Sequence, residues 1–397
     1  MLLEILLAIL FGIIAGTITG LIPGIHMNLV GTTLVVLSAS LLSPIAPIYL
    51  VVFIVAMAIS HTFIDFIPSI FLGCPDTDTE LSILPGHELL KKGQGYEAIL
   101  LTAYGSLAAV LILILISFPS YFIVEKIYDF LKNFMAYFLL GILALLIFLE
   151  KQKLKALFVF GLTGALGLIV LNSEIKEPLL PLLTGLFGAS MLIMSIKAKT
   201  HIPQQKITKP KLKGNFLSPL FGALVASPLS SLLPGLGSGQ AAIIGNSISK
   251  TDRKGFLILL GATNTLVMGF SFVSLYLISK TRTGAAVAIN SILGNFSLQI
   301  LILILGVSLI TGIISFFLTS SLARIFSEKI SKINYTKISV ATLGILIFVV
   351  FIISNFLGLV ILTISTLTGI YCISLGTRRT NMMGCLLIPT IVFYLIM

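Results

Sequence analysis

Long apolar runs separated by short polar loops fill nearly the whole chain. Four such runs close each half, at roughly 97–117, 133–149, 154–171 and 178–196, and then at 296–321, 338–354, 356–376 and 382–396. Runs of this length are typical of helices that cross the ~30 Å hydrocarbon core of a bilayer. The pattern predicts an all-α polytopic membrane protein of about 12 helical segments.

One long apolar segment in each half is broken by Pro-Gly. The breaks read Gly20-Leu21-Ile22-Pro23-Gly24-Ile25-His26-Met27-Asn28 and Ser231-Leu232-Leu233-Pro234-Gly235-Leu236-Gly237-Ser238-Gly239-Gln240. Lipid cannot satisfy the backbone groups that a break exposes, so breaks persist where they are buried in protein or face a watery cavity. The helix that restarts points its N–H groups and positive dipole end into the gap, which suits a carboxylate or phosphate.

Paired breaks therefore predict a binding site for a small anionic solute. The candidate residues are Pro23, Gly24, His26 and Asn28 in the first half and Pro234, Gly235, Gly237, Ser238, Gly239 and Gln240 in the second. The alternative for each break is a proline kink relieved by packing.

A basic stretch divides the chain. The segment Lys197–Lys213 holds six lysines and two prolines but no acidic residue, as a cytoplasmic loop would. We predict a first membrane repeat at 1–196, a basic cytoplasmic linker at 197–214 and a second membrane repeat at 215–397.

The two halves are predicted to be inverted copies. Aligning Phe11-Gly12 with Phe221-Gly222 brings the two Pro-Gly breaks to within one residue of each other. Lysine and arginine positions place the loop after 97–117 outside and the equivalent loop after 296–321 inside, which is the arrangement of an inverted-topology repeat. Both termini are then external. Each broken segment is either one interrupted crossing or a re-entrant pair.

Two ionisable residues lie four apart inside an apolar run. His61 and Asp65 share a helix face and are placed to pair. Such groups are costly in a membrane, so they indicate a proton relay or part of a cation site, with Ser60 or Thr62 supplying neutral oxygens. The alternative is a satisfied pair near a helix end. Asn264 aligns with His61 and makes a symmetric site plausible.

Each half also carries a polar tip. Asp76 and Asp78 in the first tip align with Lys280 and Arg282 in the second. At a repeat interface, the basic pair would bind an anionic substrate and the acidic pair a cation, or the opposite charges would pair as a gate. Ordinary solvated loops are the alternative.

Composition narrows the class further. Hydrophobic residues make up 57% of the chain and charged residues 10%, and the net charge of +11 comes from basic loops, so positive-inside bias explains it without nucleic acid. Three cysteines and four histidines form no CxxC pair or metal cluster. We expect no cofactor, only Na⁺ or H⁺ as a coupling ion. The N-terminus lacks the basic region of a secretory signal, so we expect it to be retained.

Several motifs, in order, resemble the large membrane subunit of the tripartite tricarboxylate transporters. That family's G-x-x-x-G-x-x-P-G stretch is similar to 16–24, and its S-I-L-L-N-T-P-G segment to 69–75. Its D-G-Y-x-x-A-x-x-G pattern resembles 84–98, its P-G-L-G form 232–237 and its closing G-L-F stretch 181–188. The chain departs from the family at His26 and Asp76, and Lys280-Thr281-Arg282 lacks Pro-Gly.

The resemblance implies a permease for carboxylates such as citrate, driven by an ion gradient. It also implies two partners, a small membrane subunit and an extracytoplasmic solute-binding protein. We expect a multi-pass protein of the plasma membrane and no catalytic residues. The alternative function is a membrane-embedded enzyme that acts on a lipid or isoprenoid head group, with His61 and Asp65 as acid and base.

Overall fold

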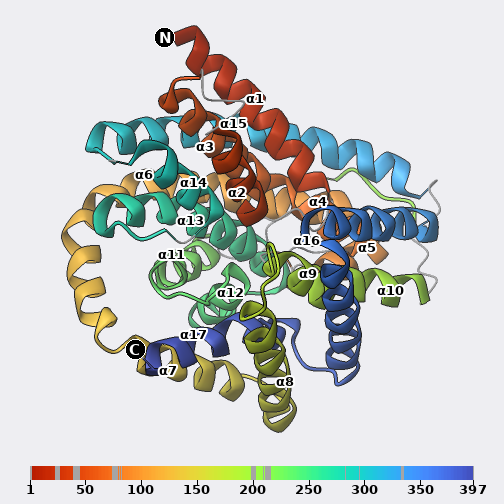
Figure 1. Cartoon of the computed structure of the whole chain (residues 1–397). Helices are drawn as coiled ribbons and strands as arrows, with labels where there is room; N and C mark the ends of the chain where they lie inside the picture. The colour runs from red at the N-terminus through yellow and green to blue at the C-terminus, as the bar shows by residue number, and fades with distance from the viewer. Residues whose placement is uncertain are drawn as a thin grey trace.

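A computed structural model shows that the chain folds into packed α-helices (Figure 1). It describes residues 2–22, 27–38, 45–73, 79, 81, 83–197, 203–208, 210, 216–281, 283–294, 296–331 and 335–396. Nine helices within these residues are long and apolar enough to cross a membrane. No strand occurs in the described part of the chain, so the predicted all-α polytopic class is confirmed.

The predicted apolar runs form helices. The first half contains α1 (Leu2–Leu21), α2 (Met27–Ser38), α3 (Pro47–Ile64), α4 (Phe66–Leu72), α5 (Ile83–Lys91), α6 (Gly95–Lys132), α7 (Met135–Phe148), α8 (Lys153–Leu171), α9 (Leu179–Leu183), the π-helical turn η2 (Thr184–Ala189) and α10 (Ser190–Lys197). The second half contains α11 (Leu217–Leu232), α12 (Ser238–Ser249), α13 (Arg253–Ile278), α14 (Gly284–Leu293), α15 (Leu298–Ile330), α16 (Tyr335–Ser374), η3 (Arg379–Met383) and α17 (Gly384–Ile396). The long α16 is kinked at Asn355, whose φ is 55°, between the two runs that the sequence separates.

Both Pro-Gly pairs interrupt the helices, as predicted. The helix α1 ends at Leu21 and α2 begins at Met27, while α11 ends at Leu232 and α12 begins at Ser238. Pro23, Gly24 and His26 lie outside the described residues.

The two helices of the second broken segment fold back on each other. The helices α11 and α12 lie antiparallel, because Ser218 Oγ donates to the Ser249 carbonyl at 2.9 Å and Gly222 lies against Gly245. At ~1.5 Å per residue, the 16 residues of α11 span about 24 Å and the 12 of α12 about 18 Å, less than a ~30 Å hydrocarbon core. We therefore expect a re-entrant pair whose Pro234-Gly235 tip lies inside the membrane.

The long helices of each half pack against long helices of the other half. The helix α6 packs along α13, and α15 packs along α3. At the first contact, a Cβ on Gly105 would strike the Ile258 carbonyl, and one on Gly261 would strike the Thr102 carbonyl. Small residues allow this close approach of helix backbones in membranes.

The helices α6 and α15 run antiparallel. Tyr96 at the start of α6 shares a hydrogen bond of 3.2 Å with Ser320 near the end of α15, and the Tyr104 ring lies 5.1 Å from Phe316. This is the orientation that an inverted repeat requires. The duplication itself stays a prediction.

One end of the bundle, which we call the basic end, gathers the linker and several helix termini. Lys206 N donates to the Gly93 carbonyl at 2.7 Å, and the Gln205 side chain accepts from Gly95 N at 2.8 Å. Nearby, Lys254 at the start of α13 pairs with Glu97 of α6. The basic linker and the Gly93 turn thus share one side of the molecule. By the positive-inside rule, this side is the expected cytoplasmic one.

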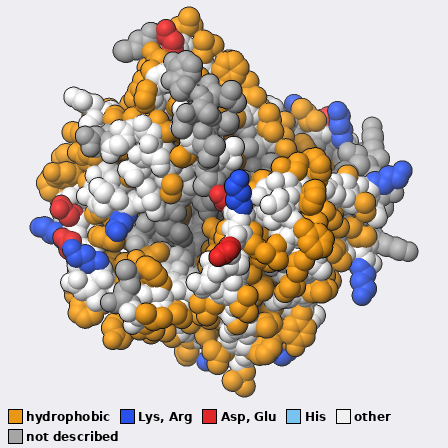
Figure 2. All heavy atoms as spheres, in the orientation of Figure 1, with side chains coloured by type: hydrophobic (Ala, Val, Ile, Leu, Met, Phe, Trp, Pro, Cys, Tyr) orange, Lys and Arg blue, Asp and Glu red, His pale blue; other side chains and the backbone are white. Residues whose placement is uncertain are grey.

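Hydrophobic side chains cover much of the outer surface (Figure 2). Leu115, Phe118 and Ile169 are among the large exposed apolar residues of the spanning helices, with exposed fractions above 70%. A bilayer is the environment that covers such a surface.

Candidate functional site

A buried carboxylate and a buried amide join the two halves at the centre of the bundle. Asn264 Nδ2 of α13 donates to Asp65 Oδ2 at 2.8 Å, and the residues are 5% and 4% exposed. Asp65 lies at the junction of α3 and α4, where its backbone N–H donates to the His61 carbonyl and its side chain caps neither helix. A carboxylate in this position is costly unless neighbouring polar groups stabilise it or a bound cation neutralises it.

Hydroxyl groups surround this pair. Thr62 and Thr265 share a hydrogen bond of 3.0 Å, and His61 Nδ1 lies 3.1 Å from Thr19 Oγ1 of α1. Ser60 Oγ donates to the Ile13 carbonyl at 3.3 Å. His61 and Asp65, predicted to share a helix face, thus each contact a polar side chain of another helix.

Thr62 and Thr265 occupy equivalent positions in the alignment of Ser60-His61-Thr62 with Thr263-Asn264-Thr265. Equivalent residues touch each other only where a twofold axis passes between them. The contact is therefore the one that a pseudo-twofold relation between the halves would produce, at the centre of the polar cluster.

The first break begins beside Asp65. Gly20, in the last turn of α1, lies so near α3 that an added Cβ would be 3.1 Å from Ile64 Cβ and 3.3 Å from Asp65 N. The chain reaches Pro23 three residues later. Asn28 lies in the first turn of α2.

The second break lies beside Asn264. Ser231 Oγ donates to the Val267 carbonyl at 3.4 Å, and Val267 follows Asn264 by one helical turn on α13. Gly235 has φ +80°, a conformation that favours glycine, and Ser230 Oγ donates to the Leu236 carbonyl at 2.7 Å. The described helix ends that lead into the two breaks thus contact α3 and α13 close to Asp65 and Asn264, while Gly235 itself lies against Thr390 of α17.

The helix that restarts after the second break offers donors to an anion. Gln240 Oε1 accepts from Gly237 N at 2.9 Å and so caps the N-terminus of α12, whose first turn holds Ser238 and Gly239. Gln240 Nε2 is buried and, within the described residues, donates to no acceptor. A buried amide donor without an acceptor is costly, so an anion that accepted from it would stabilise the site.

Each polar tip makes a hydrogen bond back to the helix that precedes it. Ser69 shares a hydrogen bond of 2.6 Å with Thr79, and Ser271 shares one of 2.8 Å with Thr283. Neither serine stood out in the sequence; the repetition of a serine on the helix and a threonine at the tip was the available signal. Asp76, Asp78 and Arg282 lie outside the described residues.

Lys280 lies away from this cluster. Its Nζ is 5.9 Å from the centre of the Tyr128 ring, and the residue is exposed. Fourteen residues separate Asn264 from Ile278, the end of α13, which at ~1.5 Å per residue is about 21 Å. The structure therefore does not bring Lys280 to the pair.

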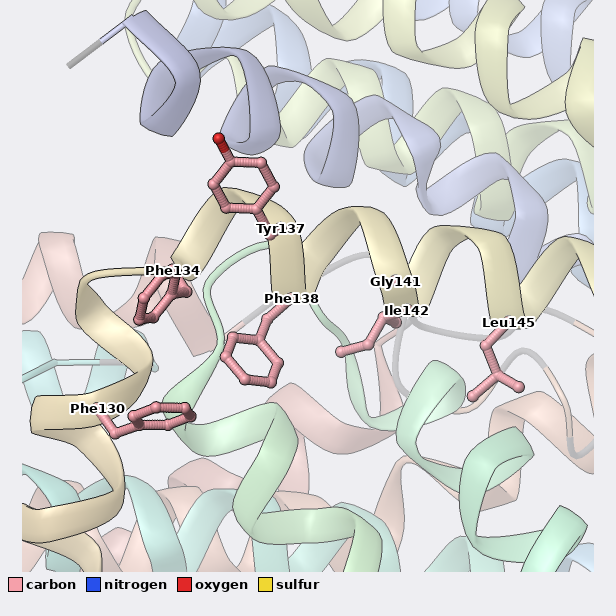
Figure 3. A pocket seen from close by; sticks show the side chains of 7 residues that line it. All are labelled: Phe130, Phe134, Tyr137, Phe138, Gly141, Ile142 and Leu145. Atoms are coloured by element: carbon pink, nitrogen blue, oxygen red, sulfur yellow. The ribbon is translucent and has the colours of Figure 1, made fainter.

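Two cavities differ in chemistry. The larger, about 500 Å³, lies along the end of α6 and α7 and is lined by aromatic and aliphatic groups such as Phe130, Phe134 and Phe138 (Figure 3). It faces outward and suits acyl chains better than an anion. The smaller, about 330 Å³, is lined in part by Asn246, Ser247 and Arg378. No cluster of three or more metal-ligating side chains occurs among the described residues.

Comparison with known proteins agrees with this architecture. The sequence pattern of the Tripartite tricarboxylate transporter TctA family matches residues 6–384. The chain belongs to this family. An uncharacterized protein of Methanocaldococcus jannaschii is 33% identical over 354 residues, which cover 86% of this chain and 88% of that protein. No solved structure matches the chain.

Membership in the TctA family indicates what the membrane-spanning helices are for. The family is the membrane component of a tripartite transporter, so this multi-pass membrane protein is a transporter component. A transporter family favours transport over the alternative of a membrane-embedded enzyme. The resemblance seen in the ordered motifs is thereby confirmed.

Proposed function

We propose that this TctA-family protein is a secondary active permease for a small anionic solute, a carboxylate, coupled to a Na⁺ or H⁺ gradient. The observation that carries the proposal is the Asp65–Asn264 hydrogen bond, which joins the halves close to the helix ends that lead into the two Pro-Gly breaks. Inverted-repeat carriers place solute and ion at such breaks near the midplane.

The anion is assigned to the second break. The N-terminus of α12 presents backbone N–H groups with a positive dipole end, and Gln240 Nε2 adds a buried donor. The first break, with Pro23, Gly24, His26 and Asn28, would supply the other wall of the site.

The coupling cation is assigned to Asp65. A Na⁺ ion would take the carboxylate together with nearby hydroxyl oxygens such as Thr62, whereas H⁺ would neutralise Asp65 directly. His61 lies one turn earlier on α3 and is placed to relay a proton. Asp76 and Asp78 are the remaining acidic candidates.

Charge neutralisation then links the two ligands. An unoccupied Asp65 resists movement into an apolar surrounding, as does an unpaired carboxylate solute. With both sites filled, the charges offset each other, and the two inverted repeats can exchange access between the sides of the membrane. In the plasma membrane, a small membrane subunit and an extracytoplasmic binding protein would serve as partners.

Thermal unfolding of the purified protein tests the proposal. Di- and tricarboxylates, phosphate and amino acids are each added in sodium and in potassium at two pH values. A ligand that binds only the folded state raises Tm by mass action, so a carboxylate should raise it, and more so with sodium or at low pH. A folded protein that responds to no carboxylate under any condition would contradict the proposal.

A further inference from the structure

The smaller cavity lies at the basic end, between α5 and α12. Pro85 of α5 forms one wall, and Ile243, Asn246 and Ser247 of α12 form another. Phe256 near the start of α13 and Arg378, which precedes η3, also line it, together with Leu81 and Leu149. Phe256 is close in sequence to Arg253 and Lys254, so the cavity lies on the side that the positive-inside rule assigns to the cytoplasm.

The equivalent position in the other half is closed. By the alignment of the halves, α2 corresponds to α12, and α14, which follows the second tip, corresponds to α5. The helices α2 and α14 pack directly on each other, and an added Cβ on Gly31 would strike the Gly284 carbonyl. A cavity thus separates α5 from α12 at one end of the bundle. Their counterparts, α14 and α2, are in direct backbone contact.

The cavity lies along α12, the helix whose first turn forms the proposed anion site. Ile243, Asn246 and Ser247 lie three, six and seven residues after Gln240, so all four share one face of α12. The buried Nε2 of Gln240 is therefore two turns deeper than the cavity mouth along the same helix face. A solute that entered here would move along α12 toward the break.

A guanidinium is held at the mouth. Arg378 Nε lies 3.6 Å from Glu150 Oε1, and the arginine side chain is 43% exposed whereas that of the glutamate is 7% exposed. Glu150 Oε1 also accepts from Asn381 Nδ2 at 3.2 Å and from Arg378 N at 3.3 Å. The carboxylate is thus buried and shared, while the charge of Arg378 remains open to solvent and suits a carboxylate ligand.

We propose that this cavity is the cytoplasmic entrance of the solute path, that Arg378 is its carboxylate-attracting residue, and that the structure has this entrance open and the external one closed. The proposal rests on the proposed carrier function. It adds the sidedness of the conformation and a binding residue that sequence analysis did not single out.

Thiol labelling tests the conformation. In a background with Cys74, Cys372 and Cys385 replaced by serine, Ser247→Cys places a thiol at the cavity, and Val35→Cys places one on α2, one turn beyond Gly31 on the same face. A membrane-impermeant maleimide should modify Ser247→Cys in inside-out vesicles and Val35→Cys in neither vesicle orientation. Modification of Ser247→Cys from the external side, or of Val35→Cys as fast as Ser247→Cys, would overturn the assignment.

Solute protection tests the path. Citrate or succinate, whichever raises the Tm of the protein, should slow the labelling of Ser247→Cys several-fold. A carboxylate that raises Tm but leaves labelling unchanged overturns the entrance and leaves the carrier function intact. If no carboxylate raises Tm, the carrier function itself fails.

Paired variants separate attraction of the solute from structural support. Arg378→Gln should raise the half-protecting solute concentration about tenfold, and Arg378→Lys should restore part of the loss. Glu150→Gln removes the same ion pair but leaves the guanidinium, so it should leave that concentration unchanged or lower it. Equal losses in Arg378→Gln and Glu150→Gln would show that only the ion pair matters and would overturn the role of Arg378.

Discussion

Glu97 and Lys254 form an ion pair that joins the first turns of α6 and α13, with Nζ 2.5 Å from Oε1, and only the carboxylate is fully buried. Glu97 is 3% exposed and also accepts from Gln94 Nε2 at 3.2 Å. The pair fixes the basic end of the long helix contact between the halves.

Glu97→Gln should destabilise the protein by about 1–3 kcal/mol, because Lys254 loses its counter-charge while only partly exposed. Thermal unfolding in detergent measures the change. Glu97→Gln combined with Lys254→Met should recover much of the loss, since it leaves no unpaired charge. A double variant less stable than Glu97→Gln would contradict this account.

Asp65→Asn should abolish the sodium or proton dependence of solute binding while the protein stays folded. Asparagine can still accept a hydrogen bond from Asn264, but it carries no charge for a cation. Solute-induced Tm shifts in sodium and potassium at two pH values provide the measurement. The matched control is Ser117→Ala on α6, whose hydroxyl donates to its own helix. An ion dependence that survives in Asp65→Asn would exclude this carboxylate as the coupling group.

Gln240→Glu should weaken solute binding at least tenfold. The carboxylate still caps Gly237 N, but it replaces the Nε2 donor with an acceptor that repels an anion. Solute titration followed by Tm gives the affinity. Gln240→Met tests the cap separately: it lacks both groups and should cost stability as well as affinity. Unchanged affinity in Gln240→Glu would place the anion elsewhere.

Gly235→Ala should destabilise the re-entrant tip by about 1–3 kcal/mol. Its φ of +80° is strained for alanine, and the new Cβ would lie 2.9 Å from Thr390 Oγ1. Gly141→Ala in α7 is the control, because nothing lies within 4 Å of its added Cβ and alanine favours a helix. Denaturation of both variants in one detergent compares them, and equal stabilities would refute the strain.

Stability should fall as pH falls from about 6.5 toward 4, in part through His87. Burial, with Arg379 and Lys91 nearby, lowers the pKa of His87 from 6.5 to about 4. The unfolded chain therefore binds a proton in this window before the folded one does, which favours unfolding, at ~1.4 kcal/mol per pKa unit. In His87→Gln, Tm should depend less on pH between 6.5 and 4. A Tm profile identical to that of the unchanged protein would rule out this contribution.

The apolar pattern was sufficient to predict the helices but not how the broken ones lie. The separation of the runs on either side of Asn355 is a local property and coincides with the kink in α16. Whether α11 and α12 cross or return depends on contacts such as Gly222 with Gly245, which composition does not encode. The alignment of the halves placed Asn264 opposite His61 and made a symmetric site plausible; in the structure Asn264 donates to Asp65, and the site itself stays a prediction.

Contacts between residues far apart in the chain could not be predicted from the sequence. Glu150 and Arg378 are 228 residues apart, and each resembles an ordinary loop charge until the fold brings them together. Thr19 lies among glycines that indicate close packing, so its contact with His61 depends on the register between α1 and α3. Periodicity identifies faces of helices; it does not identify which faces meet.

The packing of long helices between the halves bears on how the chain evolved and on whether its halves fold separately. Because α6 covers α13 and α15 covers α3, each half buries its neighbour's surface and leaves its own incomplete. We expect neither half to fold on its own, and we expect a chain cut between them to persist as a heterodimer of fragments. If the halves arose by gene duplication, the single-repeat ancestor was an antiparallel homodimer with Thr62 and Thr265 on its axis.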